Sequence, residues 1–544
     1  MRLSGDAALI YRKTFETLSR AIEFDEARKE LQSYRPVSNL EEILERQNEI
    51  RKKMEISRKL HPHEIKKLRP LKIGKSFFED RVYLASDEED YESAVRLGVC
   101  EVIRDEARTA NFPVILNDFV NRIDLKSFAP ELIVESIIEN FESFRTFAEI
   151  EARISENTHY KKLIPEIEEL TKLYSRLNEI ESIRSRIRDM EMEINREIEE
   201  RLAEIKVTIP ASELLRILRE GRLSEEIEEE IERVVSRYEK EFESMGIMES
   251  LFSRTFPVRV DEEGVERAVS RVKEKITLDY YLKCLRIAEK IDMEYINEKI
   301  EFYRAMRLYK LFDSSGYTMP EFGDGFTIIN GRNLFIEDPQ PVSYCIGRNS
   351  LFPYRESIIL LTGANSGGKT SLLDLICQAA VLAHSGLPVN AEKAEVPLYD
   401  EIFYFKRKKS SYGSGAFEKA VKSLVRAVSG DGKKLILIDE FEAITEPGAG
   451  AKILSTILKI AHEKGHHLVL VTHLGEEFRG LEFIRIDGIE AKGLDENFRL
   501  IVDRQPVFNR IGRSTPELIV ERLMEKSRGE EREILKRVLD EMGQ

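Results

Sequence analysis

The sequence contains no tryptophan, and its four cysteines lie far apart with no CxxC pair: Cys100, Cys284, Cys345 and Cys377. This spacing excludes a zinc ribbon, and a disulfide framework is not expected in so long a chain. No apolar run reaches the about 18 residues that a membrane-spanning helix needs. The opening residues also lack the apolar core of a signal peptide. We therefore expect a cytoplasmic protein without a membrane partner.

Charge of either sign is plentiful. The 544 residues include 85 Lys and Arg against 100 Asp and Glu, which gives a formal net charge of −15. This balance argues against a uniformly basic coat for nucleic acid, and the length suggests about three domains. Abundant Glu, Lys, Arg and Ile, with little Gln, are typical of proteins from hot-living organisms. We expect a prokaryotic, thermophilic source.

Two amphipathic stripes in the first part of the chain predict long helices. Apolar residues recur every three or four positions over 163–205, which is close to coiled-coil spacing. A second stripe runs over 227–245, after a connector at 207–221 that carries Pro and Gly. These stretches predict an antiparallel pair of arms, although two ordinary helices of a bundle would show the same pattern.

A basic segment at 51–75 stands out in this acidic chain. It holds ten basic against two acidic residues, a net charge of +8. Such a run is either a solvated helix face or a surface that contacts phosphates, and the residues alone leave both open. The candidates for nucleic-acid contact are Arg51, Lys52, Lys53, Arg58, Lys59, Lys66, Lys67 and Arg69.

Beyond residue 335 short apolar runs alternate with helical patterns, which predicts an α/β sheet. A strand at 358–362 enters a GxxxxGKT motif, and a helix follows it. In such a loop backbone N–H groups surround phosphate oxygens, Lys369 reaches the β and γ phosphates, and the hydroxyl of Thr370 binds Mg²⁺. The predicted nucleotide-binding residues are Gly363, Ala364, Asn365, Ser366, Gly367, Gly368, Lys369, Thr370 and Ser371.

Two further apolar strands end in polar residues that suit hydrolysis of a bound nucleotide. Residues 435–438 lead into Asp439 and Glu440, and residues 468–472 lead into His473. After a phosphate-binding loop, Asp439 is expected to hold Mg²⁺ and Glu440 to activate the attacking water. His473 is expected to sense the γ-phosphate, since a histidine changes charge near neutral pH.

Four segments together resemble the MutS family of DNA-repair ATPases. They are GANSGGKT from residue 363, HSGLPVNAEKAEVPLYDEIF from 384, LILIDEFEAITEPGAG from 435 and VTH from 471. The N-terminal opening through LEEILERQNEIRKKM resembles the shorter, second branch of that family. Ala364 stands where the family usually has Pro.

The resemblance implies a multidomain protein with an all-α core, coiled-coil lever and clamp arms, and an ABC-type P-loop α/β ATPase domain. We expect the core at 1–160, the arms at 161–262, return helices at 263–335, the ATPase at 336–512 and a helical dimerisation segment at 513–544. No segment matches a mismatch-reading domain or a C-terminal Smr nuclease domain, so no intrinsic nuclease is expected.

The resemblance also implies residues at the ATP site. A signature loop that reaches the partner's ATP corresponds to 411–418, with Ser414 as the acting residue. The aromatic residue that stacks on adenine is either Tyr344 or Phe352.

The implied function is that of a homodimeric clamp, joined through the ATPase domains, that binds branched or distorted double-stranded DNA and hydrolyses ATP to ADP with Mg²⁺, in repair or recombination. In this family the helical core lies near nucleic acid, which favours DNA contact for the segment 51–75. Two alternatives are an ATPase acting on stalled ribosomes and an SMC-type chromosome ATPase. The SMC order is not matched, because here the arms precede the P-loop. A non-enzymatic scaffold is disfavoured by the complete ATPase motifs.

Overall fold

The computed structural model describes residues 1–73, 78–85, 87–98, 100–103, 114–115, 126, 129–204, 225–314, 316–363, 368–406, 414–440, 447–494, 500–512 and 515–542. The chain divides into two compact units, one formed by 1–65 with 301–544 and the other by 66–300. Among the described residues no helix is both long and apolar enough to cross a membrane.

The centre of the first unit is a six-stranded sheet in which every neighbouring pair is parallel. Its central strands are buried along their whole length, which explains why the sequence shows continuous apolar runs there. In spatial order the strands are β1 (Arg2–Gly5), β10 (Glu401–Phe405), β11 (Lys434–Asp439), β12 (His467–Val471), β8 (Ile358–Gly363) and β13 (Ile484–Ile489).

Helices cover this sheet. Alternate strand residues, including Ile358, Leu360 and Ile436, share one buried cluster with α15 (Ser414–Val428) and α16 (Pro447–Glu463). The side chains between them along each strand point to the opposite face. Helix α14 (Lys369–His384) contacts β8, β11 and β12, and α1 (Ala7–Arg20) contacts α14.

The N-terminal strand is a part of this sheet that the sequence did not predict. Residues 1–160 were expected to form a helical core, but β1 pairs in parallel with β10 at the sheet edge. Gly5 has φ +65°, and a Cβ there would lie 2.4 Å from the carbonyl oxygen of Tyr404. The backbones therefore approach so closely that only glycine fits.

The remaining elements of the first unit surround the sheet. A four-stranded mixed sheet has the order β5–β9–β6–β7, and β14 pairs with β15 in antiparallel fashion. Their bounds, with those of the other helices that lie in or reach this unit, are α2 (Asp25–Ser33), α3 (Leu40–Arg58), α4 (Pro62–Lys67), α13 (Met293–Phe312), β5 (Glu321–Phe322), β6 (Phe326–Gly331), β7 (Val342–Ile346), β9 (Lys393–Val396), η2 (Gly475–Phe478), β14 (Ala491–Leu494), β15 (Leu500–Val502), α17 (Thr515–Lys526) and α18 (Glu530–Met542).

The second unit contains a small parallel sheet, where the sequence predicted only helices. Its order is β3–β2–β4, and α5 packs on β3. Buried Tyr83 donates a 2.9 Å hydrogen bond to Asp90 within its core. The elements are β2 (Phe78–Leu84), α5 (Glu88–Leu97), β3 (Cys100–Ile103), β4 (Val114–Ile115), α7 (Pro130–Glu139) and α8 (Phe141–Ile154).

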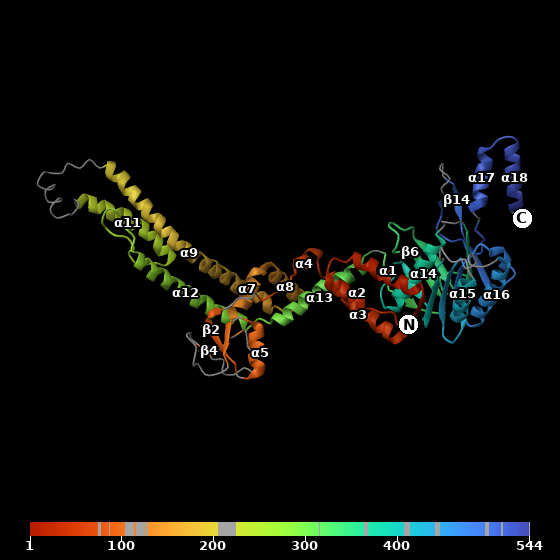
Figure 1. The fold of residues 1–544 in the computed structure, drawn as a ribbon, viewed down its shortest axis with the longest axis horizontal. Coiled ribbons are helices and arrows are strands. Elements are labelled where there is room, and N and C mark those ends of the chain that lie inside the picture. The colour runs from red at the N-terminus through yellow and green to blue at the C-terminus, as the bar shows by residue number, and fades with distance from the viewer. Residues whose placement is uncertain are drawn as a thin grey trace. The chain divides into compact units, whose positions relative to one another are not determined.

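Three helices form the arm of the second unit, as Figure 1 shows. Helix α9 (His159–Glu204) packs against both α11 (Glu225–Met245) and α12 (Glu262–Ala288). The two predicted long helices are thus present, and α12, which the sequence assigned to the return helices, also lies along α9. The connector 207–221 lies outside the described residues.

The arm is held by an apolar seam with ion pairs beside it. Ile187, Ile194 and Val234 are among its fully or almost fully buried residues. Arg201 contacts Glu230 at 2.6 Å, and Arg184 contacts Glu266 at 2.7 Å, so charged residues also link the helices. The exposed Arg184–Glu266 pair adds at most about 1 kcal/mol, whereas the buried residues of the seam remove much apolar surface from water.

Candidate ATP site

The phosphate-binding loop joins β8 to α14. Gly363 ends the strand with φ +124°, and Gly368 precedes the helix with φ +99°, both in the region that favours glycine. Buried Lys369 opens α14, and its Nζ donates a 2.7 Å hydrogen bond to the carbonyl oxygen of Gly363. The helix N-terminus adds a positive partial charge there. Residues Ala364 to Gly367 lie outside the described part of the chain.

Thr370, which follows Lys369, connects the phosphate-binding loop to β11, the strand that ends at Asp439. The hydroxyl of Thr370 donates a 2.8 Å hydrogen bond to Oδ2 of Asp439, the last residue of β11. Asp439 is only 7% exposed. Burial, the largest influence, raises its pKa, while the Thr370 hydrogen bond acts to lower it. A hydroxyl and a carboxylate at this spacing are the oxygen ligands that Mg²⁺ prefers, so these residues fit the predicted metal site.

Glu440 and His473 lie beside this pair. Because β12 lies between β11 and β8, the segments that follow these strands are neighbours. Nε2 of His473 is 3.3 Å from Oε1 of Glu440. Glu440 has φ +50°, an uncommon conformation that tends to cluster at functional sites. The structure therefore brings together Lys369, Thr370, Asp439, Glu440 and His473, as the sequence predicted.

A further acid near the site, beyond Asp439 and Glu440, escaped sequence reasoning. Asp374 lies one helical turn after Thr370 on α14, and its charge acts on Asp439. Tyr404 donates a 2.8 Å hydrogen bond to it, and Lys406 approaches its carboxylate to 2.8 Å. The sequence signal that could have revealed Asp374 was its spacing of four residues from Thr370, which places both on the same face of a helix.

The chain after β15 also lies against the loop. A Cβ on Gly368 would approach side-chain carbons of Arg504 to 3.6 Å. The backbone N–H of Arg504 is held by Gln340 at 3.2 Å, while its exposed guanidinium has no ion-pair partner within the described residues. Gly512 packs on Gly363 so closely that a Cβ would lie 2.7 Å from the Gly363 α-carbon. The sequence analysis assigned neither residue to the ATP site.

Of the two candidates for adenine stacking, Tyr344 is fully buried. Its ring stacks on Phe508 with centroids 5.8 Å apart, and its hydroxyl contacts Asp487 at 2.9 Å. Both faces are therefore unavailable to a ligand, which corrects that alternative. Phe352 is half-buried and stays a candidate.

Two predicted features are only partly described. Ser414 is the first residue of α15, but the preceding 411–413 lie outside the described residues. Ser371 lies in the first turn of α14, where its carbonyl oxygen accepts a 2.8 Å hydrogen bond from Asn333. Among the residues described, no group of three His, Cys, Asp or Glu side chains could hold a metal ion.

The basic segment spans both units. Arg51, Lys52, Lys53 and Arg58 lie on α3 and Lys59 follows it, whereas Lys66, Lys67 and Arg69 belong to the second unit. Within the described residues, at least three of these eight residues have acidic partners. Lys53 contacts Glu30 at 2.7 Å, Arg58 contacts Asp313 at 2.8 Å, and Lys67 contacts Glu142 at 3.0 Å. Local ion pairs thus offset part of the positive charge.

Comparison with known proteins identifies the family. The chain is 43% identical over 562 residues to the DNA-binding protein MutS2 of Pyrococcus furiosus, and the match covers 99% of each chain. The protein belongs to the MutS2 branch of the MutS family. No family model matches the chain.

Other MutS relatives match a shorter part. An endonuclease MutS2 of Solidesulfovibrio magneticus is 32% identical over 169 residues, which is 30% of this chain and 22% of the relative. The mitochondrial DNA mismatch repair protein MSH1 of Arabidopsis thaliana is 37% identical over 122 residues, covering 22% of this chain and 11% of the relative. The protein thus aligns almost end to end with the MutS2 of Pyrococcus furiosus and with about a fifth or less of these two.

Proposed function

We propose that this MutS2 protein hydrolyses ATP and binds branched or distorted double-stranded DNA as a homodimer, in repair or recombination. The observation that carries the ATPase assignment is the meeting of Lys369, Thr370, Asp439, Glu440 and His473 at adjacent ends of β8, β11 and β12. The DNA assignment rests on the MutS2 relative of Pyrococcus furiosus, whose name describes it as DNA-binding.

Each residue has a role that its position supports. Lys369 neutralises phosphate charge at the helix N-terminus. Thr370 and Asp439 hold Mg²⁺, which supplies positive charge to the phosphates. Glu440 takes a proton from the attacking water, and His473, 3.3 Å away, holds the Glu440 carboxylate in place. Arg504 lies against Gly368, from where its charge adds to phosphate binding.

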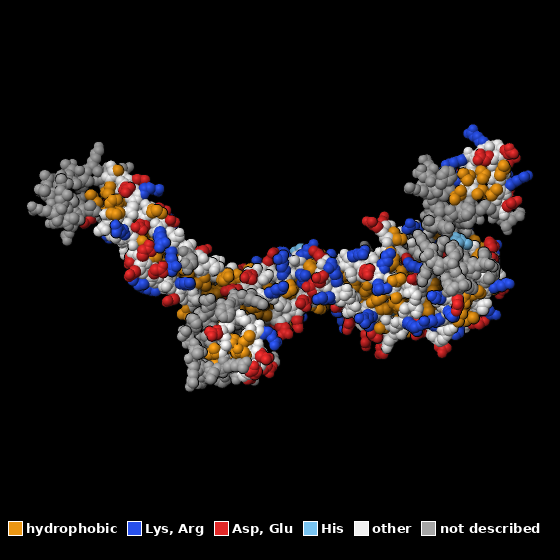
Figure 2. Space-filling model, in the orientation of Figure 1, with side chains coloured by type: hydrophobic (Ala, Val, Ile, Leu, Met, Phe, Trp, Pro, Cys, Tyr) orange, Lys and Arg blue, Asp and Glu red, His pale blue; other side chains and the backbone are white. Residues whose placement is uncertain are grey.

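An exposed apolar surface supports dimer formation. Helices α17 and α18 pack together as a hairpin, and Figure 2 shows hydrophobic side chains gathered on it. Ile519, Leu523, Ile534 and Val538 are between 39% and 56% exposed and repeat at four-residue spacing on the two helices. A second copy of the chain would remove this surface from water. From the resemblance to the MutS family we further propose that the ATPase domains also meet in this dimer, with Ser414 acting on the partner's ATP.

DNA binding is assigned to the arm and to the exposed basic residues. Arg51, Lys52 and Lys59 are exposed, and within the described residues they form no ion pair with an acidic side chain. Their contacts with phosphates would release counterions, so the affinity should fall as salt rises.

The test is ATP turnover by the purified protein, with and without branched DNA, at stated salt. Lys369→Ala should abolish nucleotide binding, whereas Lys459→Ala, on the exposed face of α16, should behave as wild type. A binding panel of homoduplex, mismatch, branched junction and ribosomes separates the possible targets. Tighter binding to ribosomes than to any of the DNA substrates would overturn the DNA assignment. Cleavage of the DNA would overturn the expectation that the protein has no intrinsic nuclease.

A further inference from the structure

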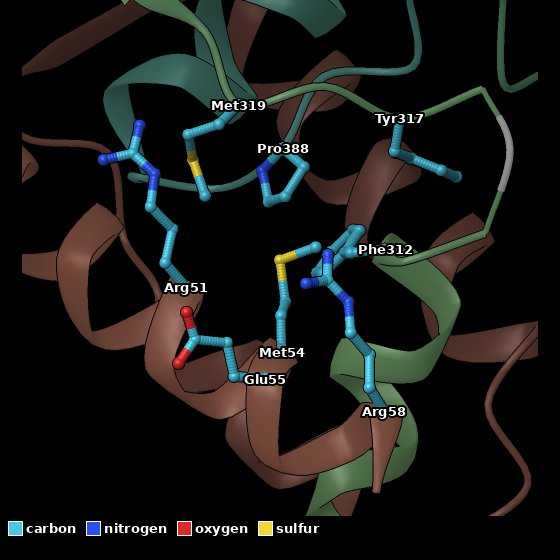
Figure 3. A pocket seen from close by; sticks show the side chains of 8 residues that line it. All are labelled: Arg51, Met54, Glu55, Arg58, Phe312, Tyr317, Met319 and Pro388. Carbon is cyan, nitrogen blue, oxygen red and sulfur yellow. The ribbon is translucent and has the colours of Figure 1, made fainter.

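A hollow of about 260 Å³ opens in the first unit beside α3, and Arg51 and Arg58 of that helix line it. Three parts of the chain line it: α3, the end of α13 with the segment that follows, and the turn after α14. Figure 3 shows the side chains that surround it. They are Arg51, Met54, Glu55, Arg58, Phe312, Tyr317, Met319 and Pro388.

The inner surface of the hollow is apolar and polarisable. Met54 and Met319 contribute thioethers, and half-buried Tyr317 contributes a ring that packs edge-on against buried Phe312. Pro388 lies across the hollow from Met54 (Figure 3). Thioethers and aromatic rings make favourable contacts with flat π-systems. Burial raises the pKa of Tyr317 to about 12, so its hydroxyl stays protonated at neutral pH and can donate a hydrogen bond.

The lining of the hollow also includes charged residues, mostly positive. Arg51 and Arg58 lie two helical turns apart on α3 and both are exposed. Nε and Nη2 of Arg58 bind one carboxylate oxygen of Asp313, at 2.9 and 2.8 Å, which leaves its Nη1 available. Nη1 of Arg51 is 3.3 Å from the amide oxygen of Asn48. Glu55 is the one acid in the lining and can accept a hydrogen bond.

We propose that this hollow takes a single unpaired base of bound DNA, with the phosphates on its two sides placed on Arg51 and Arg58. The inference deepens the proposed function and rests on it. It names the feature by which branched or distorted DNA differs from a regular duplex, because only an unpaired base can leave the stack at small cost.

Size and charge together favour a base over other occupants. The volume lies just below the range of about 300–1,000 Å³ that is usual for drug-sized ligands, which suits one flat ring system. Lys52 and Lys59 are also exposed next to the arginines, so the positive charge continues along α3 as a strand of phosphates requires. The competing occupant is an acidic protein segment that carries an aromatic side chain. The experiments below distinguish it from an unpaired base.

The test uses the full-length protein and DNA that carries one 5-iodouracil, placed either unpaired at a branch or paired within a duplex. Ultraviolet crosslinking followed by mass spectrometry should join the unpaired base to the peptide containing Met54 or the one containing Tyr317 and Met319. The paired base should not crosslink there. Crosslinks confined to other peptides would overturn the inference.

Affinity measurements provide the second arm of the test. Met319→Glu places a negative charge in the hollow, so affinity for DNA with an unpaired base should fall about tenfold, the scale of one lost base stack. Affinity for plain duplex should stay the same. The matched control is Leu9→Glu on α1, at a residue that is 51% exposed and lies outside both the hollow and the arm.

The two proposals fail in different ways. If wild type binds branched DNA but Met319→Glu leaves that affinity unchanged, the hollow does not take a base, and an acidic protein partner becomes its better occupant. If wild type binds no DNA at all, the proposed function itself is wrong. Crosslinking requires only the wild-type protein, so poor folding of Met319→Glu would still leave the inference testable.

Discussion

The hydroxyl of Thr370 donates a 2.8 Å hydrogen bond to Oδ2 of Asp439, although 69 positions separate them. The bond joins the first turn of α14 to the end of β11 across the intervening strand β12. Two oxygen ligands for Mg²⁺ are thereby already in contact before a nucleotide arrives. Such preorganisation removes part of the ordering cost from the binding step.

Replacing Thr370 tests this arrangement. Thr370→Val keeps the shape but removes the hydroxyl, so we expect ATP hydrolysis to fall about a hundredfold, the usual scale for losing one preorganised polar group. Thr370→Ser keeps the hydroxyl and should stay within a few-fold of wild type. Steady-state hydrolysis measured over a range of Mg²⁺ concentrations makes the comparison. Equal rates for the Val and Ser variants would contradict the role.

Close packing between Gly512 and Gly363 predicts a backbone effect on nucleotide binding. Gly512→Ala would place a Cβ 2.7 Å from the Gly363 α-carbon, and neither backbone can move without shifting the start of the phosphate-binding loop. We expect weaker ATP binding by isothermal titration. Gly480→Ala is the control, since nothing lies within 4 Å of that position. Wild-type affinity in Gly512→Ala would show that the loop does not depend on this contact.

A buried ion pair predicts a large loss of stability. Arg485 and Asp487 are almost fully buried, with Nη2 and Oδ2 at 2.9 Å. Arg485→Ala leaves a buried carboxylate without its partner, which costs about 3–5 kcal/mol. Arg510→Ala removes an ion pair with Glu490 at an exposed site and should cost less than about 1 kcal/mol. Urea unfolding of both variants gives the comparison, and similar losses would contradict it.

Buried His466 predicts a pH dependence of folding. Burial, the main cause, lowers its pKa to about 4, against about 6.5 in the unfolded chain. Between these values only the unfolded state binds the proton, so stability falls as the pH falls from about 7 to 4, by about 2 kcal/mol at pH 5. His466→Leu should flatten this slope in urea unfolding, whereas His61→Gln, at an exposed position, should not. An unchanged slope in His466→Leu would refute the assignment.

The strands that position the candidate ATP site could be predicted from the sequence because their signals are local. The strand expected at 358–362 is β8 (Ile358–Gly363), and the one at 468–472 is β12 (His467–Val471). Each is a continuous apolar run that ends in a polar functional residue, and parallel strands place such ends side by side. The stripe over 163–205 likewise corresponds to α9.

The features that escaped prediction depend on contacts distant in sequence. Strand β1 has four residues and pairs with β10 about 400 positions away, so nothing in its own residues distinguishes it from a disordered N-terminus. Arg504 lies beside Gly368 in a segment that residues far away in sequence hold in place. Gln340 accepts a hydrogen bond from the backbone of Arg504, and the backbone of Ser343 donates one to Gln505. The small sheet around β2 follows the basic segment, and its short strands carry few residues from which to read an alternation.

Single-turnover hydrolysis by Glu440→Gln tests the central claim most directly. The substitution keeps the size and position of the side chain but removes the base, so this variant should bind ATP as tightly as wild type and hydrolyse it at least about a hundredfold more slowly. Glu463→Gln, at the exposed end of α16, is the matched control and should hydrolyse normally. Hydrolysis by Glu440→Gln at the wild-type rate would contradict the account.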